Sequence, residues 1–277
     1  MKSTNLKISI ITPSFNQGDY IEETILSVLN QDYDNIEYII IDGGSTDQTT
    51  KIIKKYEDKI SYWISEKDSG QSDAINKGFR VGTGDVYCWL NSDDVLIEGA
   101  LKVVNDYFQK NEKIDFINGY TLRIDHESRI LFNNYILKPS NFFAKHGIFN
   151  IAQQSMFWRK KVFEKIGYLK EDFHAEMDKE FLIRILTNNL GIALIKKPLG
   201  AIRIHENTKT SSAGSIWEND KNKIREKYNG NYDDQNRSKL IFIVFVIFKA
   251  IQLKYIHNTF FKLKWRNKLV KRYQLKS

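Results

Sequence analysis

Short apolar runs alternate with amphipathic segments along residues 1–109. The apolar runs are rich in β-branched side chains and predict strands at Ile8–Thr12, Ile36–Asp42, Ile60–Ser65 and Val86–Leu90. Between and after them, apolar side chains recur every three or four residues, which predicts helices at Tyr20–Asn30, Thr46–Tyr56, Gln71–Val81 and Glu98–Gln109. Strands that alternate with helices through short loops are typical of an α/β protein with a mostly parallel central sheet flanked by helices.

The pattern becomes less regular after Asp115. A strand is predicted at Phe116–Tyr120, followed by a hairpin turn at Asp125–Ser128. Further on, the apolar positions predict two helices and then two strands, at Lys160–Ile166, Asp178–Asn188, Ile192–Ile195 and Ala201–Ile204.

Two polar segments mark breaks in this organisation. Residues 207–214 are rich in Thr and Ser and predict a loop, and residues 229–236 (NGNYDDQN) predict a linker. We therefore expect one globular domain over residues 1–228, with halves at about 1–100 and 101–228, and a helical basic tail over residues 229–277.

The net positive charge of the chain comes from this tail. The net charge is +8, yet residues 235–277 hold eleven Lys or Arg and no Asp or Glu, so the other 234 residues carry −3. A nucleic-acid-binding domain would carry a basic stripe on its own surface, so we expect no nucleic-acid partner. The single cysteine, Cys88, excludes an internal disulfide framework. With no apolar leader and no run long enough to span a membrane, we expect a cytoplasmic protein.

The tail combines an apolar run with basic and aromatic side chains. Residues 240–248 (LIFIVFVIF) precede a segment, residues 249–272, in which eight Lys or Arg are interleaved with Phe, Trp and Tyr. Interfacial helices have this composition, so the tail predicts peripheral binding to an anionic membrane surface at its cytoplasmic face. The alternative is a helix that packs on the domain and ends in a solvated basic segment.

Polar and acidic side chains follow three of the predicted strands. They form the sequences TPSFN at 12–16, DGGSTD at 42–47 and NSDD at 91–94. The carboxyl ends of parallel strands meet at one edge of a sheet, where ligands bind in open α/β folds. Each sequence also suits a turn or a helix N-cap, but three together at one edge favour a binding site.

The adjacent carboxylates of Asp93 and Asp94 need a positive partner. The chain contains neither of the usual glycine-rich phosphate loops, so a bound diphosphate would have to be neutralised in another way. Carboxylates at a strand end suit a hard divalent cation that shares its coordination with phosphate oxygens. We therefore expect Mg²⁺ or Mn²⁺ at this position.

The ordered motifs IITPSFN, IDGGSTD, DAINKG at 73–78 and NSDD resemble those of family 2 glycosyltransferases, which have the GT-A fold. The resemblance implies transfer of a sugar from a nucleoside diphosphate with inversion at the anomeric carbon. It places the donor in the first half of the domain and the acceptor in the second. By position, the nucleoside pocket would be lined by Thr12, Pro13, Ser14 and Asn16. Asp42 would lie near the base, followed by Gly43 where many relatives have a second carboxylate, and uridine is the commonest base in the family.

The same resemblance implies roles for further side chains. Asp93 would approach the ribose and the metal, Asp94 would ligate the metal, and His205 would complete the metal shell or touch the diphosphate. Asp68 and Asp73 would contact donor hydroxyls and Lys77 or Arg80 a phosphate. The alternatives are a helix cap for Asp73, a solvated basic face for Lys77 and Arg80, and a structural role for His205.

A carboxylate at the start of the later helix would act as the general base. Asp178 matches this position best, with Glu176 and Glu180 as the other candidates and a helix cap as the alternative role for Asp178. His146 and His174 would lie near the acceptor.

We therefore expect a metal-dependent hexosyl- or N-acetylhexosaminyltransferase that acts on a saccharide acceptor, lipid-linked, in surface polysaccharide synthesis. The first alternative is a sugar nucleotidylyltransferase, although such enzymes have a glycine-rich basic loop where this chain has TPSFNQG. The second is a non-catalytic membrane-bound protein that retains the fold.

Overall fold

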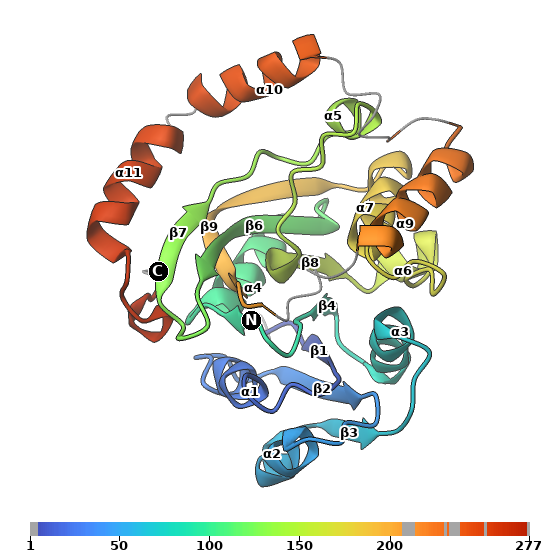
Figure 1. The fold of residues 1–277 in the computed structure, drawn as a ribbon, viewed down its shortest axis with the longest axis vertical. Helices are drawn as coiled ribbons and strands as arrows, with labels where there is room; N and C mark the ends of the chain where they lie inside the picture. The colour runs from blue at the N-terminus through green and yellow to red at the C-terminus, as the bar shows by residue number, and fades with distance from the viewer. Residues whose placement is uncertain (1–4, 207–213, 230–231, 233–238, 252–253, 276–277) are drawn as a thin grey trace.

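The computed structural model describes residues 5–206, 214–229, 232, 239–251 and 254–275 (Figure 1). One nine-stranded sheet runs through the molecule in the order β3-β2-β1-β4-β8-β6-β9-β5, with β7 paired to β6. Helices lie on both faces of this sheet (Figure 1). The predicted loop at 207–214 and linker at 229–236 fall largely outside the described residues.

The first half of the chain forms the parallel part of the sheet. Its strands are β1 (Ile8–Ser14), β2 (Ile36–Asp42), β3 (Tyr62–Ser65) and β4 (Val86–Trp89), and its helices are α1 (Ile21–Leu29), α2 (Thr49–Lys55), α3 (Gln71–Val81) and α4 (Ala100–Lys110). In the register, Ser14 lies opposite Asp42 and Asp42 opposite Ser65. The carboxyl ends of these strands therefore meet at one edge, as the α/β pattern predicts.

The central strands β1, β2 and β4 are mostly apolar because both faces of the sheet are buried there. Ile10, Ile40 and Cys88 point to one face, which is covered by α1 and α4. Ile11, Ile39 and Trp89 point to the other, which is covered by α3 and by helices from the second half. Every residue of β1 is buried, so no polar alternation is visible in its sequence.

The second half adds mainly antiparallel pairs. Its strands are β6 (Phe116–Ile124), β7 (Ile130–Asn134), β8 (Met156–Arg159) and β9 (Ile192–Arg203), and the short β5 (Val95–Leu96) at the end of the first half pairs antiparallel with β9. β8 runs antiparallel to β4 and β6 and so joins the two halves. The strands predicted at 192–195 and 201–204 are one continuous strand, β9, whose register on β6 shifts near Tyr120. The predicted hairpin at Asp125–Ser128 connects β6 to β7.

The helices of the second half are α5 (Asn141–Lys145), α6 (Lys161–Ile166), α7 (Met177–Thr187) and α9 (Gly214–Lys227). Short 3₁₀ turns lie at Glu57–Lys59, Gln153–Ser155 and Val270–Arg272. The sequence pattern predicted α6 and α7 to within one residue at each end, but neither α9 nor β8.

The tail folds as α10 (Lys239–Ile251) and α11 (Lys254–Trp265). Phe245 of α10 packs between Leu137 and Ile148, whereas α11 lies along β7. Val270 enters an apolar cluster with Phe261 and Trp265 packed against it. Among the described helices, none has the length and apolar content that a bilayer crossing requires.

Gly78 lies where α3 crosses β1, and a Cβ at this position would overlap Cγ2 of Ile11. We expect Gly78→Ala to lower the free energy of unfolding by about 1–3 kcal/mol, because the buried strand has no room to move away. Chemical denaturation measures this change. Gly214 is also helical and has no atom within 4 Å of an added Cβ, so Gly214→Ala should change stability by less than about 0.5 kcal/mol. Equal effects would show that α3 does not pack this closely.

Candidate functional site

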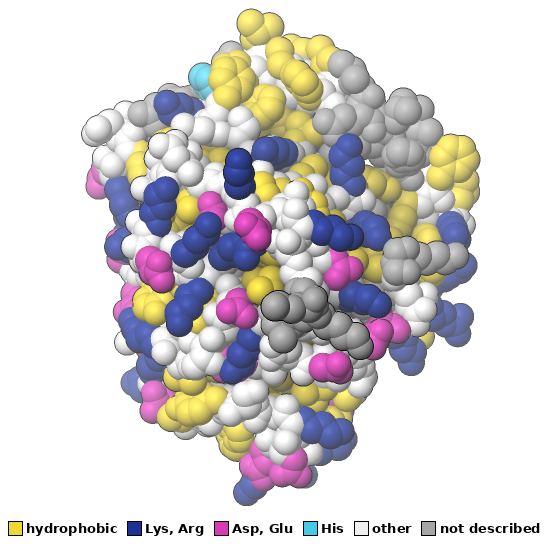
Figure 2. All heavy atoms as spheres, turned by 180° about the vertical axis from the view of Figure 1, so that it is seen from behind, with side chains coloured by type: hydrophobic (Ala, Val, Ile, Leu, Met, Phe, Trp, Pro, Cys, Tyr) yellow, Lys and Arg dark blue, Asp and Glu magenta, His cyan; other side chains and the backbone are white. Residues whose placement is uncertain are grey.

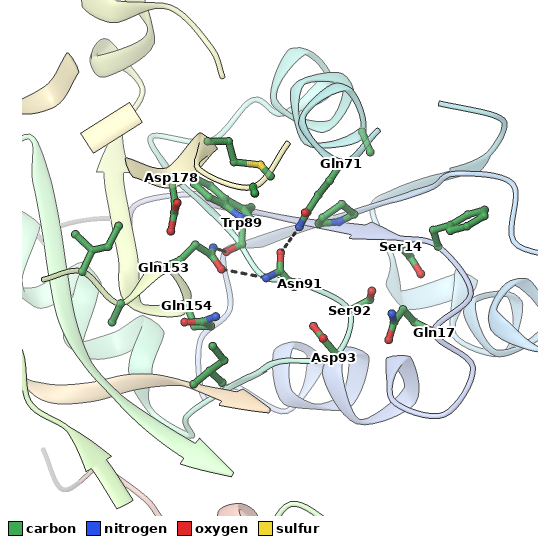
Figure 3. Close-up of a pocket in the computed structure, with 18 of the residues that line it drawn as sticks. Ser14, Gln17, Gln71, Trp89, Asn91, Ser92, Asp93, Gln153, Gln154 and Asp178 are labelled. Carbon is green, nitrogen blue, oxygen red and sulfur yellow. Dashed lines mark hydrogen bonds between the residues drawn. The ribbon is translucent and has the colours of Figure 1, made fainter. Parts of the chain in front are cut away.

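A cavity of about 620 Å³ opens at the carboxyl edge of the parallel strands. Both halves of the chain line it (Figure 3). The first half contributes Pro13, Ser14, Gln17, Asp68, Gln71, Trp89, Asn91, Ser92 and Asp93, and the second contributes Thr121, Arg123, Asn134, Gln153, Gln154, Asp178 and Trp217. Residues that are far apart in the sequence therefore share one space, as expected at such an edge.

The two adjacent carboxylates differ in their surroundings. Asp93 lines the cavity, whereas Asp94 is 2% exposed and is not among the lining residues. The Oδ2 of Asp94 accepts hydrogen bonds from Gln154 Nε2 at 2.8 Å and Asn91 Nδ2 at 3.2 Å. Its Oδ1 accepts one from the backbone N–H of Arg203 at 3.0 Å. Both carboxylate oxygens of Asp94 thus accept hydrogen bonds from N–H groups of the protein itself.

Burial and the nearby charge of Asp93 raise the pKa of Asp94 well above its ordinary value, against the effect of these three donors. The proton is therefore held more tightly in the folded chain than in the unfolded chain. A cation beside Asp93 would weaken the contribution of its charge and favour the ionised form of Asp94.

The side chain of Arg203 holds the turn at Asp93 and Asp94 in place. It is 1% exposed, and its Nε donates to the backbone carbonyl of Asp93 at 2.8 Å. Its Nη2 forms an ion pair with Glu23 at 2.6 Å, and its guanidinium lies 5.0 Å from the ring centroid of Tyr20. A buried guanidinium with all these partners fixes the end of β9 to α1 and to the aspartate turn.

Of the other predicted metal ligands, Asp93 lines the cavity, and His205 lies next to it without being part of the lining. His205 Nε2 lies 3.2 Å from Asp93 Oδ2, and the ring centroids of His205 and Tyr20 are 4.5 Å apart. In the part of the chain that the structure describes, no group of three or more His, Cys, Asp or Glu forms a potential metal site. Two protein ligands still fit Mg²⁺ or Mn²⁺, because these ions take much of their shell from phosphates and water.

A chain of side-chain amides crosses the floor of the cavity (Figure 3). Gln71 Nε2 donates to Asn91 Oδ1 at 2.9 Å, and Asn91 Nδ2 lies 3.3 Å from Gln153 Oε1. Gln153 Nε2 in turn donates to the carbonyl of Trp89 at 2.8 Å. No role for these three amides was expected from the sequence, although Asn91 begins the NSDD motif that follows a predicted strand.

Of the three candidates for the base, only Asp178 lines the cavity. It lies in the first turn of α7, where its Oδ1 accepts the backbone N–H of Lys179 at 2.8 Å. Glu176 is 2% exposed and paired with Lys179, and burial raises its pKa. Glu180 is fully buried; burial alone would raise its pKa, but Arg184 and Lys227 hold the pKa below its ordinary value. Asp178 is therefore the one of these three candidates whose side chain borders the cavity.

A second buried carboxylate positions the segment before Asp178. Asp220 of α9 is fully buried, and its Oδ2 accepts the backbone N–H groups of His174, Ala175 and Glu176 at 2.7, 2.6 and 3.1 Å. Three donors on one oxygen fix the entry into α7. The helix that was not predicted from the sequence thus supports the candidate base.

The residues predicted for the nucleoside pocket divide into two groups. Pro13 and Ser14 line the cavity, and Ser14 Oγ is buried with no hydrogen-bond partner among the described residues. Thr12 is fully buried, with its hydroxyl 3.2 Å from that of Tyr38, and Asn16 Oδ1 accepts the backbone N–H of Thr46. Thr12 and Asn16 therefore shape the strand end without lining the cavity.

Asp42 closes the turn after β2. It is fully buried and accepts hydrogen bonds from Gly44, Ser45 and Ser65. Gly43 lies against Asp68, because an added Cβ would come within 2.5 Å of Asp68 Oδ2. Asp68, and not Asp42, is the carboxylate that lines the cavity on this side.

The remaining candidates lie outside the cavity lining. Asp73 accepts the backbone N–H of Ser69, as its alternative role as a cap implies, and Lys77 pairs with Glu66 at 2.9 Å. Arg80 pairs with Glu171, and His146 packs against Phe142. His174 is also absent from the lining. Contacts of these residues with the nucleotide-sugar donor or with the saccharide acceptor stay predictions.

The family model of glycosyl transferase family 2 matches residues 9–167. An uncharacterised glycosyltransferase of Rickettsia typhi is 29% identical over 219 residues, or 74% of this chain and 66% of that protein. TuaG of Bacillus subtilis, a putative teichuronic acid biosynthesis glycosyltransferase, is 36% identical over 124 residues, or 43% of this chain and 49% of that protein. The chain spans 66%, 42% and 41% of the length of three curated relatives.

Solved structures agree at the level of the fold. Staphylococcus aureus TarS residues 1–349, in complex with UDP-GlcNAc, superposes with a TM-score of 0.63 at 20% identity, covering 79% of this chain and 67% of that one. The mannosyltransferase PcManGT of Pyrobaculum calidifontis, in complex with GDP-Man and Mn²⁺, gives 0.58 at 16% identity, covering 74% and 59%. The resemblance seen in the strand-end motifs is confirmed: the chain belongs to glycosyl transferase family 2 and has the GT-A fold.

Proposed function

We propose that this protein is an inverting glycosyltransferase of surface polysaccharide synthesis that uses a nucleoside-diphosphate sugar and a saccharide acceptor. The observation that carries the proposal is that Asp93 and Asp178, from opposite halves of the chain, line one cavity. A relative named for teichuronic acid biosynthesis supports the polysaccharide context. Family membership favours this reaction over the synthesis of a nucleotide sugar.

The donor would lie against the carboxyl ends of β1, β2 and β4. Pro13 and Ser14 offer an apolar surface and a buried hydroxyl with no partner among the described residues, which suit a nucleoside. Asp68 would accept from a donor hydroxyl. One structural neighbour is described with UDP-GlcNAc and another with GDP-Man, so either base is compatible with this fold.

Asp93 and His205 would hold Mg²⁺ or Mn²⁺, which would neutralise the charge of the diphosphate. Asp94, predicted as a ligand, would first have to give up hydrogen bonds to Gln154, Asn91 or Arg203. We therefore propose that Asp93 faces the cation and that Asp94 positions the turn.

Asp178 would remove the proton from the attacking hydroxyl of the acceptor. The hydroxyl oxygen forms a bond to the anomeric carbon while the bond from that carbon to the diphosphate oxygen breaks on the opposite side, which inverts the configuration. Only one protein carboxylate is needed for this displacement, because the nucleoside diphosphate leaves as an anion. The fixed entry into α7 keeps Asp178 in place for the transfer.

We further propose that α10 binds the cytoplasmic leaflet of a membrane and so brings the cavity to a lipid-linked acceptor. Leu240, Ile243, Ile247 and Phe248 are 70%, 53%, 49% and 51% exposed. Hydrophobic side chains gather at the end of the molecule where α10 lies (Figures 1 and 2). The exposed apolar side chains of α10 are followed by residues 249–272, which hold eight Lys or Arg and no Asp or Glu. This combination matches an anionic lipid surface, where each Lys or Arg contributes on the order of 1 kcal/mol.

Asp178→Asn should lower the rate of sugar transfer about 100-fold or more, because an amide cannot accept the proton of the acceptor. Donor binding should change little, since Asp178 lies on the acceptor side. Transfer to membrane-extracted acceptor and calorimetric binding of the nucleotide sugar measure the two effects. Glu226→Gln, an exposed carboxylate on α9, is the control and should leave both unchanged. Near-normal turnover by Asp178→Asn would exclude Asp178 as the base.

Asp93→Asn should raise the Mn²⁺ concentration needed to stabilise the nucleotide-bound protein by about tenfold or more, with little change in the stability of the protein alone. Asp94→Asn should instead lower the free energy of unfolding by about 1–3 kcal/mol, because an amide N–H would face the buried N–H donors. Thermal denaturation with UDP or GDP across a Mn²⁺ series separates the two. If Asp94→Asn loses the Mn²⁺ response and keeps its stability, Asp94 is the ligand.

Replacement of Ile243 and Ile247 by Ser should reduce flotation of the full chain with vesicles that contain anionic phosphatidylglycerol. These point variants test the surface better than truncation does, because Val270 lies in an apolar cluster of the body. Val81→Ser removes an exposed apolar side chain at the end of α3 and is the control. Unchanged flotation would contradict the proposal, and loss of a stable dimer in the double variant would assign α10 to contact with a second copy.

A further inference from the structure

The outer part of β6 turns one face toward the cavity. Side chains alternate along a strand, so Leu122 and Ile124 enter an apolar cluster while Thr121 and Arg123 line the cavity. The neighbouring strands add Asn134, the register partner of Thr121, and Ile202, the register partner of Arg123. This wall belongs to the second half of the chain.

Arg123 is the basic side chain of the cavity lining, whose other charged members are Asp68, Asp93 and Asp178. Its guanidinium lies 5.4 Å from the ring centroid of Phe132. Its Nε is shielded from solvent and has no hydrogen-bond partner, and no ion pair between described residues includes it. Among the described residues, the charge of Arg123 thus contacts the ring of Phe132 and forms no ion pair with a carboxylate.

The Nε–H of the charged Arg123 side chain therefore has no acceptor among the described residues, although the side chain borders a partly closed cavity. A buried N–H without an acceptor costs on the order of 1–3 kcal/mol, and more where the group is charged. Lys262 of α11 adds a second cation, with its Nζ 5.6 Å from the same ring centroid. Two positive groups therefore lie next to the ring of Phe132, and their charge favours an anionic ligand over a neutral one.

We infer that Arg123 binds an anionic group of the acceptor, a carboxylate or a phosphate. This inference rests on the proposed transferase function and specifies its acceptor. The planar guanidinium matches both anions, since each can accept two parallel N–H donors. Arg123 lies on the β6–β7–β9 side of the cavity, in the half of the chain that also holds Asp178, whereas the proposed donor surface lies at the ends of β1, β2 and β4.

Paired sugars that differ in charge test this assignment. The ligands share one scaffold: phenyl β-D-glucuronide has a carboxylate, phenyl β-D-glucoside 6-phosphate has a phosphate, and phenyl β-D-glucoside is neutral. Dissociation constants are measured by titration calorimetry on the full chain, with and without saturating UDP or GDP and Mn²⁺. The variants are Arg123→Gln, Arg123→Lys, and the control Arg129→Gln, an exposed arginine at the start of β7 that pairs with Glu127.

We expect the unsubstituted protein to bind at least one of the two anionic sugars about tenfold more tightly than the neutral glucoside. Arg123→Gln should abolish this preference, Arg123→Lys should keep part of it because the charge remains without the planar fork, and Arg129→Gln should keep all of it. The stronger of the two anionic ligands identifies the group as carboxylate or phosphate.

Equal or undetectable binding of the charged and neutral sugars would overturn the inference, as would a preference that survives in Arg123→Gln. A tenfold loss of UDP or GDP affinity in Arg123→Gln would also overturn it, and would place Arg123 at the diphosphate of the donor. Absence of nucleoside diphosphate binding by the unsubstituted protein would instead count against the proposed transferase function, because the sugar titrations without nucleotide are independent of it.

Discussion

The cavity depends on one buried carboxylate. Asp94 accepts hydrogen bonds from Asn91 after β4, from Gln154 in a 3₁₀ turn, and from the backbone of Arg203 at the end of β9. These three segments are up to 109 residues away along the chain. A carboxyl group so deeply buried is tolerated only when such donors surround it, so the turn has little freedom to rearrange. Its neighbour Asp93 consequently faces the cavity.

A buried carboxylate also fixes the backbone on the opposite side of the cavity, before α7. Asp220 reaches from α9 to three backbone N–H groups before α7, and Asp178 follows directly in the first turn of that helix. Asp93 and Asp178, which are partly buried and line the cavity, thus each lie near a buried acidic group that fixes the neighbouring backbone. The conformational cost of ordering both sides is met during folding, which leaves the site arranged before substrates arrive.

The two halves of the sheet differ in the hydrogen bonding of the polar side chains that they place near the cavity. The parallel half presents strand ends whose polar groups mostly bond to one another, as Asp42 does with Ser45 and Ser65. The β6–β7–β9 wall instead holds Arg123, whose Nε has no protein partner in the described chain. This contrast fits the proposed placement of the donor at the parallel strand ends and of the acceptor at the β6–β7–β9 wall.

The sequence by itself determined the first hundred residues closely, because parallel strands buried on both faces leave continuous apolar runs between amphipathic helices. It also marked Asp93 and Asp178 by their places at a strand end and a helix start. Only the tertiary structure decided which of two adjacent aspartates faces the cavity, because that choice depends on Gln154 and Arg203, which lie far away in sequence. Likewise, no local pattern shows that α9 supports α7, or that Arg123 has no partner for its Nε: burial and pairing are properties of the packed chain.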